Sequence, residues 1–337
     1  MSLPDQIETK DLLQIFDTML QQHDMLRTQY TNTSNGWKQE IKEFKSLTHD
    51  DLLTIDASQW PEQQYQERTQ ELANELSAKF ELDGGSLYRF VYLDGGENTS
   101  SQLLIIIHHL LVDIVSFNIL VTEMQSVWSR IESGASLQLT SKSNSFKQWS
   151  NALQEFAKTE QCELQREYWE QFTGLNLLPL PKDIVEGSNS VASGTQIMSA
   201  LSEAVTSNMT KVLVKANVQP KDVLLSALVM TLAEYSGQSR IAVEVEEHGR
   251  DVLDGALDVS RTFGWFTKAF PLICDVPSRN DSATAIKNIS QLAAVASDNG
   301  LGFGLGKQFA ANKENEQYKL NGITAFTDHD GYTLYIE

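Results

Sequence analysis

The sequence predicts a mixed α/β protein of two lobes, and three observations support this prediction. The 337 residues are too many for one ordinary core and suit two lobes of roughly 150–200 residues each. Strand-like and helix-like periodicities both occur in each half of the chain. Between the halves, residues 179–194 concentrate Pro, Gly, Ser and Asn, which is typical of a linker. We therefore expect an N-terminal lobe at 1–178 and a C-terminal lobe at 195–337.

In the first half, the pattern predicts a β-hairpin flanked by helices. Alternating apolar residues predict strands at Ser86–Asp94 and Gln102–His108, and the turn at 95–98 joins them. Helical spacing predicts a helix over 12–20, and HDMLR at 23–27 ends it. Further helices are predicted over much of 61–80, over 117–131 as far as Gly134, and over 147–172.

In the second half, strands are expected near 196–201 and at 241–246 and 270–274. Helices are expected around 203–216, 222–233 and 282–298, and the last of them is expected to end in a glycine-rich turn at 300–304. The segment 222–233 is apolar on all sides, which predicts a buried helix.

Composition excludes several classes of function. The formal net charge of −19 disfavours binding to nucleic acid or to an anionic membrane surface. Cys162 and Cys274 lie far apart without metal-binding spacing, so we expect two reduced packing residues and no metal site. No signal peptide, membrane span or G-x-S-x-G nucleophile motif is found, and we expect a soluble, cytoplasmic protein that is not a serine hydrolase.

One segment places titratable side chains at the end of a predicted strand. The apolar run Ile105–Ile107 leads into His108 and His109, and Asp113 lies four residues further on. If the histidines end the strand, their side chains point to opposite faces, so only one imidazole faces a given cavity. Because histidine titrates near neutral pH, that residue is a natural proton carrier.

Five ordered motifs resemble one family. HHLLVD at 108–113 resembles the HHxxxDG motif of the condensation superfamily of nonribosomal peptide synthetases, in particular of its epimerization domains. DVLLSA at 222–227, EEHGRD at 246–251, RTFGWFT at 261–267 and GLGFG at 300–304 are similar to further motifs of that family, and HDMLR at 23–27 and FKQW at 146–149 match more weakly. The pair EEHGR and GWFT is the feature that distinguishes epimerization domains from ordinary condensation domains.

The resemblance implies a fold, an activity and a partner. The fold would be a two-lobed, V-shaped pseudodimer like chloramphenicol acetyltransferase. The activity would be inversion, L to D, of the α-carbon of an aminoacyl or peptidyl thioester in nonribosomal peptide synthesis. The partner would be a peptidyl carrier protein among neighbouring synthetase domains. Its 4′-phosphopantetheine arm would bring the thioester to the cleft between the lobes, and no cofactor would be bound by this chain itself.

The resemblance also implies roles for residues. His109 and Glu246 would be opposed acid and base, with the direction of each transfer left open, and a raised pKa in an apolar cleft would suit the carboxylate to proton transfer. Asp113 would pair with Arg250 or Arg261, and His108 would be structural. The substrate tunnel would involve Ile114, Ser116, His248, Trp265 and Thr267.

The sequence also departs from the family pattern. Ile114 replaces the glycine that follows the motif aspartate, and the early P-I-Q-x-W-F and late F-N-Y-L-G motifs are not found. Isoleucine would be strained if φ is positive there and would crowd the tunnel if φ is negative. Ile114→Gly is therefore expected to raise activity if the protein is a weakly active epimerase. Two alternatives to an active epimerase stay open: a catalytically impaired carrier-docking module, and a condensation-type acyltransferase that forms peptide bonds.

Overall fold

The computed structural model describes residues 3, 7–96, 100–172, 175, 180–184, 190, 193–195, 197, 199–250, 253, 257–276 and 282–309. Their contacts divide the chain into two compact units. Unit 1 comprises 1–153 and 248–267, and unit 2 comprises 154–247 and 268–337. The division differs from the expected boundary at 179–194, because residues after 153 group with unit 2. The loop at 248–267, which carries HGR and GWFT, groups with unit 1 and not with the second half of the chain.

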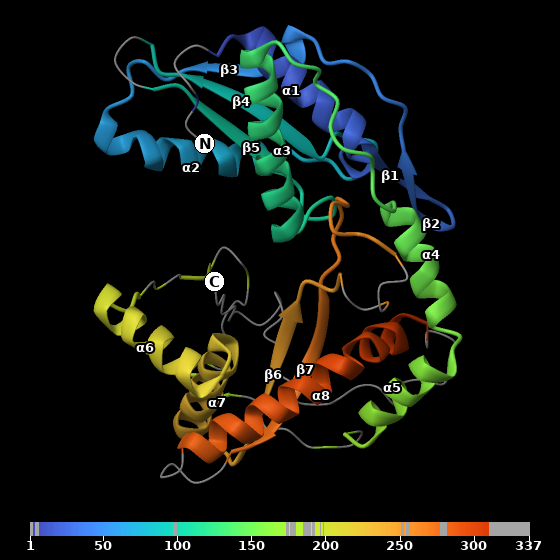
Figure 1. Ribbon diagram of the computed structural model, residues 1–337, viewed down its shortest axis with the longest axis vertical. Helices are drawn as coiled ribbons and strands as arrows, with labels where there is room; N and C mark the ends of the chain where they lie inside the picture. Colours follow the sequence, from blue (N-terminus) through green and yellow to red (C-terminus); the bar gives the residue numbers. More distant parts are fainter. Residues whose placement is uncertain are drawn as a thin grey trace. The chain divides into compact units, whose positions relative to one another are not determined.

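The centre of unit 1 is a three-stranded sheet with helices on both faces (Figure 1). Its order is β3 (Leu53–Asp56), β4 (Tyr88–Asp94) and β5 (Gln102–Ile107), with β3 parallel and β5 antiparallel to β4. The predicted β4–β5 hairpin is therefore confirmed. Side chains alternate along β4, so that Phe90 joins the core formed with α1 (Thr9–Gln22) and α3 (Ile114–Ser133), whereas Val91 joins the core formed with α2 (Glu62–Ser77).

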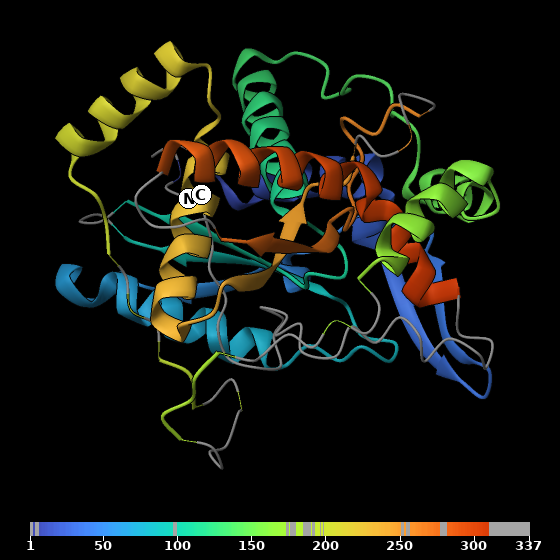
Figure 2. The same cartoon turned by 90° about the horizontal axis from the view of Figure 1, so that it is seen from below.

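The ends of the helices in unit 1 follow from local sequence. Asp113 caps the first turn of α3, accepting a hydrogen bond from the Ser116 amide, and Gly134 ends the helix in the left-handed conformation at φ 64°. HDMLR forms a separate 3₁₀ turn, Asp24–Arg27, after α1. Strands β1 (Thr28–Thr33) and β2 (Gly36–Ile41) form an antiparallel hairpin at one end of the unit (Figure 2).

Unit 2 is built on two antiparallel strands, β6 (Arg240–Glu247) and β7 (Lys268–Asp275). Helix α8 (Ser282–Phe309) runs beside them (Figures 1 and 2), and α5 (Glu160–Glu170) and α7 (Pro220–Ser236) add to the same core. Helix α6 (Glu203–Ala216) is capped by Ser202. As expected, Cys162 and Cys274 are buried free thiols, and burial raises the pKa of Cys274 to about 12.

Two predictions for these segments were wrong. The single helix expected over 147–172 is two helices, α4 (Phe146–Phe156) and α5, because the chain turns at 157–159 and Thr159 caps α5. In the stretch 196–201, the described residues 197 and 199–201 form no strand.

The predicted glycine-rich turn at 300–304 was also wrong, because these residues continue α8. The glycines allow close packing instead of a turn. A Cβ on Gly300 would lie 2.5 Å from the Phe270 ring, and the Gly302 amide donates to the Gln165 side chain at 2.9 Å. Gly304 has no atom near an added Cβ. Sequence therefore identified special positions here but assigned them the wrong role.

Replacing these glycines by alanine should separate two effects on stability, the steric overlap of an added methyl group and the gain in helix propensity. Gly300→Ala is expected to lower the free energy of unfolding by about 1–3 kcal/mol, because the added methyl group overlaps Phe270 on β7. Gly304→Ala should raise it by up to about 1 kcal/mol, since helix propensity improves without a clash. Urea unfolding of the two variants measures both changes. Equal effects of the same sign would contradict the packing role of Gly300.

Candidate active site

The two histidines lie in the turn that follows β5. The strand ends at Ile107, the His108 amide donates to the Leu87 carbonyl, and residues 109–111 form the turn that leads to Asp113. The predicted strand 102–108 thus ends one residue earlier than expected, and neither histidine belongs to it. Their side chains nevertheless have different surroundings, as the sequence argument required.

The His108 side chain is held by contacts within unit 1. Its Nδ1 accepts a hydrogen bond from the Leu110 amide at 3.1 Å, and its ring meets the edge of Phe80 at a centroid distance of 6.1 Å. Burial, followed by the charge of His109, lowers the pKa of His108. A neutral imidazole with an occupied Nδ1 suits the supporting role that was expected of His108.

His109 has the opposite character, because its side chain is exposed. One face is supported by Trp265, at a centroid distance of 4.8 Å and an interplanar angle of 57°. Trp265 is itself 45% exposed. The two rings form an accessible pair on unit 1, with an imidazole whose orientation is limited by an aromatic neighbour.

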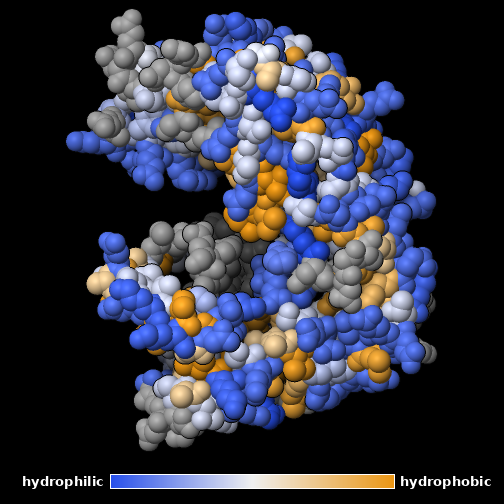
Figure 3. All heavy atoms as spheres, viewed as in Figure 1, coloured by the Kyte–Doolittle hydropathy of each residue, from blue (hydrophilic) through white to orange (hydrophobic). Residues whose placement is uncertain are grey.

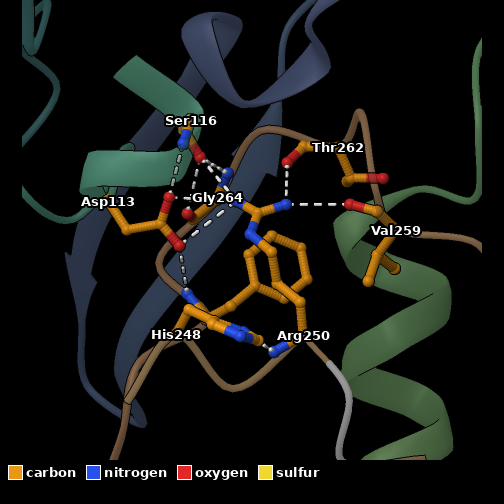
Figure 4. Close-up of polar contacts among 8 residues, drawn as sticks. Asp113, Ser116, His248, Arg250, Val259, Thr262 and Gly264 are labelled. Carbon is orange, nitrogen blue, oxygen red and sulfur yellow. Dashed lines mark hydrogen bonds and ion pairs between the residues drawn. The ribbon is translucent and has the colours of Figure 1, made fainter. Parts of the chain in front are cut away.

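The turn and the GWFT loop are joined by a buried ion pair (Figure 4). Asp113 and Arg250 have side chains that are 4% and 8% exposed, and Arg250 Nη2 lies 2.9 Å from Asp113 Oδ1. The other terminal nitrogen of Arg250 donates to the carbonyls of Val259 and Thr262. Burial lowers the pKa of Arg250 although Asp113 opposes the shift, and a guanidinium group remains charged throughout. Of the two expected partners of Asp113, the structure selects Arg250.

Ser116 and Gly264 form the second connection between α3 and the loop (Figure 4). The Ser116 hydroxyl donates to the Gly264 carbonyl at 3.0 Å and accepts from the Gly264 amide at 3.2 Å. Gly264 has a φ of 156°, and a Cβ there would overlap the ring of Phe146. Ser116 was expected to face the substrate tunnel, but its side chain is fully buried in this contact.

Arg261 binds a different acid. Its guanidinium group contacts Glu123 on α3, and Glu123 Oε2 lies 2.8 Å from His23 Nε2. Sequence reasoning missed Glu123 and His23. The available signal was a carboxylate at 123 within the apolar stripe of α3 that includes Leu120, Met124 and Val127.

The end of β6 carries Glu246, which is exposed and pairs in register with Ala269 of β7. Its neighbour Glu247 points into unit 2, where Lys221, Ser297 and Lys268 bind it. Burial alone would raise the pKa of Glu247, but these partners lower it to about 2. The apolar environment expected for Glu246 is therefore not present in the structure of unit 2.

Two other expected tunnel residues, His248 and Thr267, lie in the loop. His248 is exposed, and its Nδ1 accepts a hydrogen bond from the Arg250 amide at 3.2 Å, so that it stabilises the turn at the start of the loop. Thr267 is half-buried at the end of the loop. Within the described ranges, no three His, Cys, Asp or Glu side chains are placed to hold a metal ion, and no helix is long and apolar enough to cross a membrane.

Comparison with known proteins gives the family. The family model described as "Condensation domain" matches residues 1–323. This chain belongs to the condensation-domain family. The condensation domain is 33% identical over 311 residues to a linear gramicidin synthase of Brevibacillus parabrevis, covering 91% of this chain and 6% of that protein. It is 29% identical over 302 residues to surfactin synthase subunit 2 of Bacillus subtilis, covering 89% of this chain and 8% of the relative. The chain thus spans a small part of the relatives it matches.

Solved structures agree with this assignment of fold. The epimerization domain from the third module of tyrocidine synthetase B superposes with a TM-score of 0.83 at 24% identity, covering 91% of this chain and 69% of the other. The first condensation domain of the calcium-dependent antibiotic synthetase superposes with a TM-score of 0.74 at 15% identity, covering 90% and 70%. The expected mixed α/β condensation fold is therefore confirmed.

Ile114 in this condensation domain is the first residue of α3, and its side chain is 73% exposed. Figure 3 shows apolar side chains gathered over the start of this helix. Among the described residues other than glycine, only Asn217 has a positive φ, so Ile114 is not strained. Backbone strain at Ile114 is therefore excluded, and steric crowding of the substrate tunnel stays a prediction.

Alanine and glycine at position 114 should then have the same effect on turnover. If the branched side chain hinders substrate, Ile114→Ala and Ile114→Gly should each raise turnover roughly threefold, equivalent to about 0.7 kcal/mol of activation free energy. The glycine variant should also be the less stable, because glycine weakens a helix more than alanine does. Steady-state kinetics of both variants test this, and turnover unchanged from the native protein in both would show that Ile114 does not hinder the reaction.

Proposed function

We propose that this condensation domain epimerizes the α-carbon of an aminoacyl or peptidyl thioester held on a peptidyl carrier protein. The observation that carries the proposal is the exposed His109 ring, supported by Trp265 of the GWFT loop, which the Asp113–Arg250 ion pair joins to the HHxxxD turn. The HHxxxD turn, the HGR part of EEHGR and the GWFT segment thus meet in unit 1 through His109, Asp113, Arg250 and Trp265.

The chemistry needs only proton transfer. A thioester carbonyl acidifies the α-C–H bond, so a base can take the proton while the bonding pair moves into an enolate. A protonated group on the other face then returns a proton to the α-carbon and inverts it. Two groups exchange protonation states in each cycle and are reset by solvent, and no oxidant or reductant is required.

His109 and Glu246 are the groups that we assign to these steps. His109 is exposed and can exchange protons with both substrate and solvent. Glu246 is exposed at the end of β6 in unit 2. That both act on one substrate rests on the resemblance of EEHGR to the epimerization motif. His108, with its Nδ1 occupied, is assigned to support.

The thioester would reach the site on the 4′-phosphopantetheine arm of the partner carrier protein, alongside neighbouring synthetase domains. The relatives include subunits of a linear gramicidin synthase and of a surfactin synthase, and the resemblance to nonribosomal peptide synthetases implies carrier-bound intermediates. A net charge of −19 makes broad electrostatic attraction to an acidic carrier unfavourable, so recognition should rely on a local surface.

The fold is shared with condensation domains, so the test must separate two reactions. A carrier loaded with an L-aminoacyl or L-peptidyl thioester is incubated with the protein in D₂O, and the product is released and analysed for chirality and mass. Deuterium at the α-carbon with a mixture of L and D products supports the proposal. Peptide-bond formation with a second loaded carrier, without exchange, identifies a condensation enzyme. Absence of both reactions identifies a carrier-docking module.

A further inference from the structure

A buried charged cluster lies behind the proposed active site in unit 1. It consists of Glu123 on α3, His23 before the 3₁₀ turn, and Arg261 at the start of RTFGWF, and we call it the Glu123 cluster. His23 and Glu123 are 3% and 7% exposed. His23 Nε2 donates to one carboxylate oxygen at 2.8 Å, and Arg261 donates to the other from Nε at 3.1 Å. Three distant segments therefore meet at one carboxylate.

The carboxylate of Glu123 is held in its charged form. Burial would raise its pKa, but the hydrogen bonds and charges of His23 and Arg261 more than compensate and leave the pKa below its ordinary value. Buried ion pairs generally add little stability relative to apolar residues of the same size, and their best-attested use is to specify one arrangement. The question is therefore which arrangement the Glu123 cluster specifies.

The cluster holds one end of a short segment that carries Trp265. Arg261 binds Glu123, and the ring of Phe263 contacts the His23 imidazole at a centroid distance of 4.2 Å. On the other side of Trp265, the Phe266 amide donates to Asp113 at 3.3 Å. Phe263, Gly264 and Phe266 are buried, whereas Trp265 between them is exposed against His109.

We propose that the Glu123 cluster is a positioning device for the His109–Trp265 pair. It fixes the segment before Gly264, as the hydrogen bond from the Phe266 amide to Asp113 fixes the segment after it, so that Trp265 meets the imidazole in one orientation. Its consequence for catalysis rests on the proposed epimerase function. None of its three members needs to touch substrate.

The variant that tests this is Glu123→Gln, which preserves size but removes the charge. The matched control is Glu132→Gln, an exposed acid on the same helix. The first readout needs no substrate: ¹³C-labelled histidine is followed by NMR through a pH titration, with the His109 signal assigned from its absence in His109→Gln. The exposed His49 serves as an internal reference.

In Glu123→Gln we expect the His109 signal to shift throughout the titration, as its ring contact with Trp265 changes, while the His49 signal is unaffected. Deuterium exchange at the substrate α-carbon should fall in kcat by about tenfold, with KM within twofold, because misplaced catalytic groups lose rate and not binding. Glu132→Gln should match the native protein in both measurements.

A Glu123→Gln variant that changes only the melting temperature, and leaves the His109 titration and kcat like those of the native protein, would overturn the proposal. If that variant does not fold, Arg261→Lys is subjected to the same measurements, since it keeps the charge pair but loses the two-nitrogen contact. If the native protein shows no α-proton exchange, the proposed function fails, and the NMR titration still decides whether the cluster positions His109.

Discussion

Replacing His109 by alanine is expected to lower the rate of α-proton exchange by about a thousandfold, because positioned general acid–base groups contribute roughly 10²–10⁴-fold. The protein should keep its fold, since the His109 side chain is exposed and its described contact is the Trp265 ring. Exchange in D₂O on a loaded carrier, measured by mass spectrometry, gives the rate. Circular dichroism and the melting temperature establish that the variant is folded.

Two controls make this result specific. His49→Ala removes another exposed histidine of unit 1 and should leave exchange unchanged. Added imidazole should restore part of the rate in His109→Ala, because the vacated space beside Trp265 is open to solvent. Exchange at the native rate in His109→Ala would remove His109 from the mechanism and with it the proposed pair of acid and base.

The largest loss of stability is expected from Asp113→Ala. The substitution leaves the Arg250 guanidinium, 8% exposed, without its buried counter-charge, and such a loss typically costs about 3–5 kcal/mol. It also removes the acceptor of the Ser116 amide at the start of α3 and of the Phe266 amide in the loop. Urea unfolding should therefore show a decrease of about 4 kcal/mol in the free energy of unfolding.

The matched control is Asp275→Ala, which breaks a 2.7 Å ion pair with Arg240 on the surface of unit 2. Asp275 has a side chain that is 71% exposed, so its loss should cost at most about 1 kcal/mol. If both variants lost the same small amount, the Asp113–Arg250 pair would not hold the loop in place. If Asp113→Ala were destabilised but Asp113→Asn much less so, hydrogen bonding and not charge would be the larger contribution.

Much of the secondary structure could be predicted, because the periodicity of apolar and polar residues is a property of the local sequence. The hairpin of β4 and β5, helix α3 ending at Gly134, and strands β6 and β7 all follow from apolar spacing and turn residues. The glycines at 300–304 show the limit of such reasoning. A glycine signals either a turn or a close contact, and only the approach of Phe270 shows that Gly300 serves a contact.

The site could be predicted as a set of residues but not as a set of contacts. Asp113 needed a cationic partner, yet Arg250 and Arg261 were equivalent in the sequence, because which arginine reaches which acid depends on the path of the loop. The exposed state of Glu246 could not be foreseen either. Strand alternation places Glu246 and Glu247 on opposite sides of β6, but the sequence does not say which side contains the lysines.

The route of the chain through residues 248–267 limits how this protein can be divided. A fragment made of residues 1–178 would contain Asp113, Ser116 and Glu123 but none of their partners from the loop. The two carboxylates would lose their arginines, and the buried Ser116 hydroxyl would lose its contacts with Gly264. Recombination between relatives faces the same condition. A chimaera that exchanges the N-terminal segment should exchange residues 248–267 together with it, even though 94 residues of unit 2, 154–247, intervene in the chain.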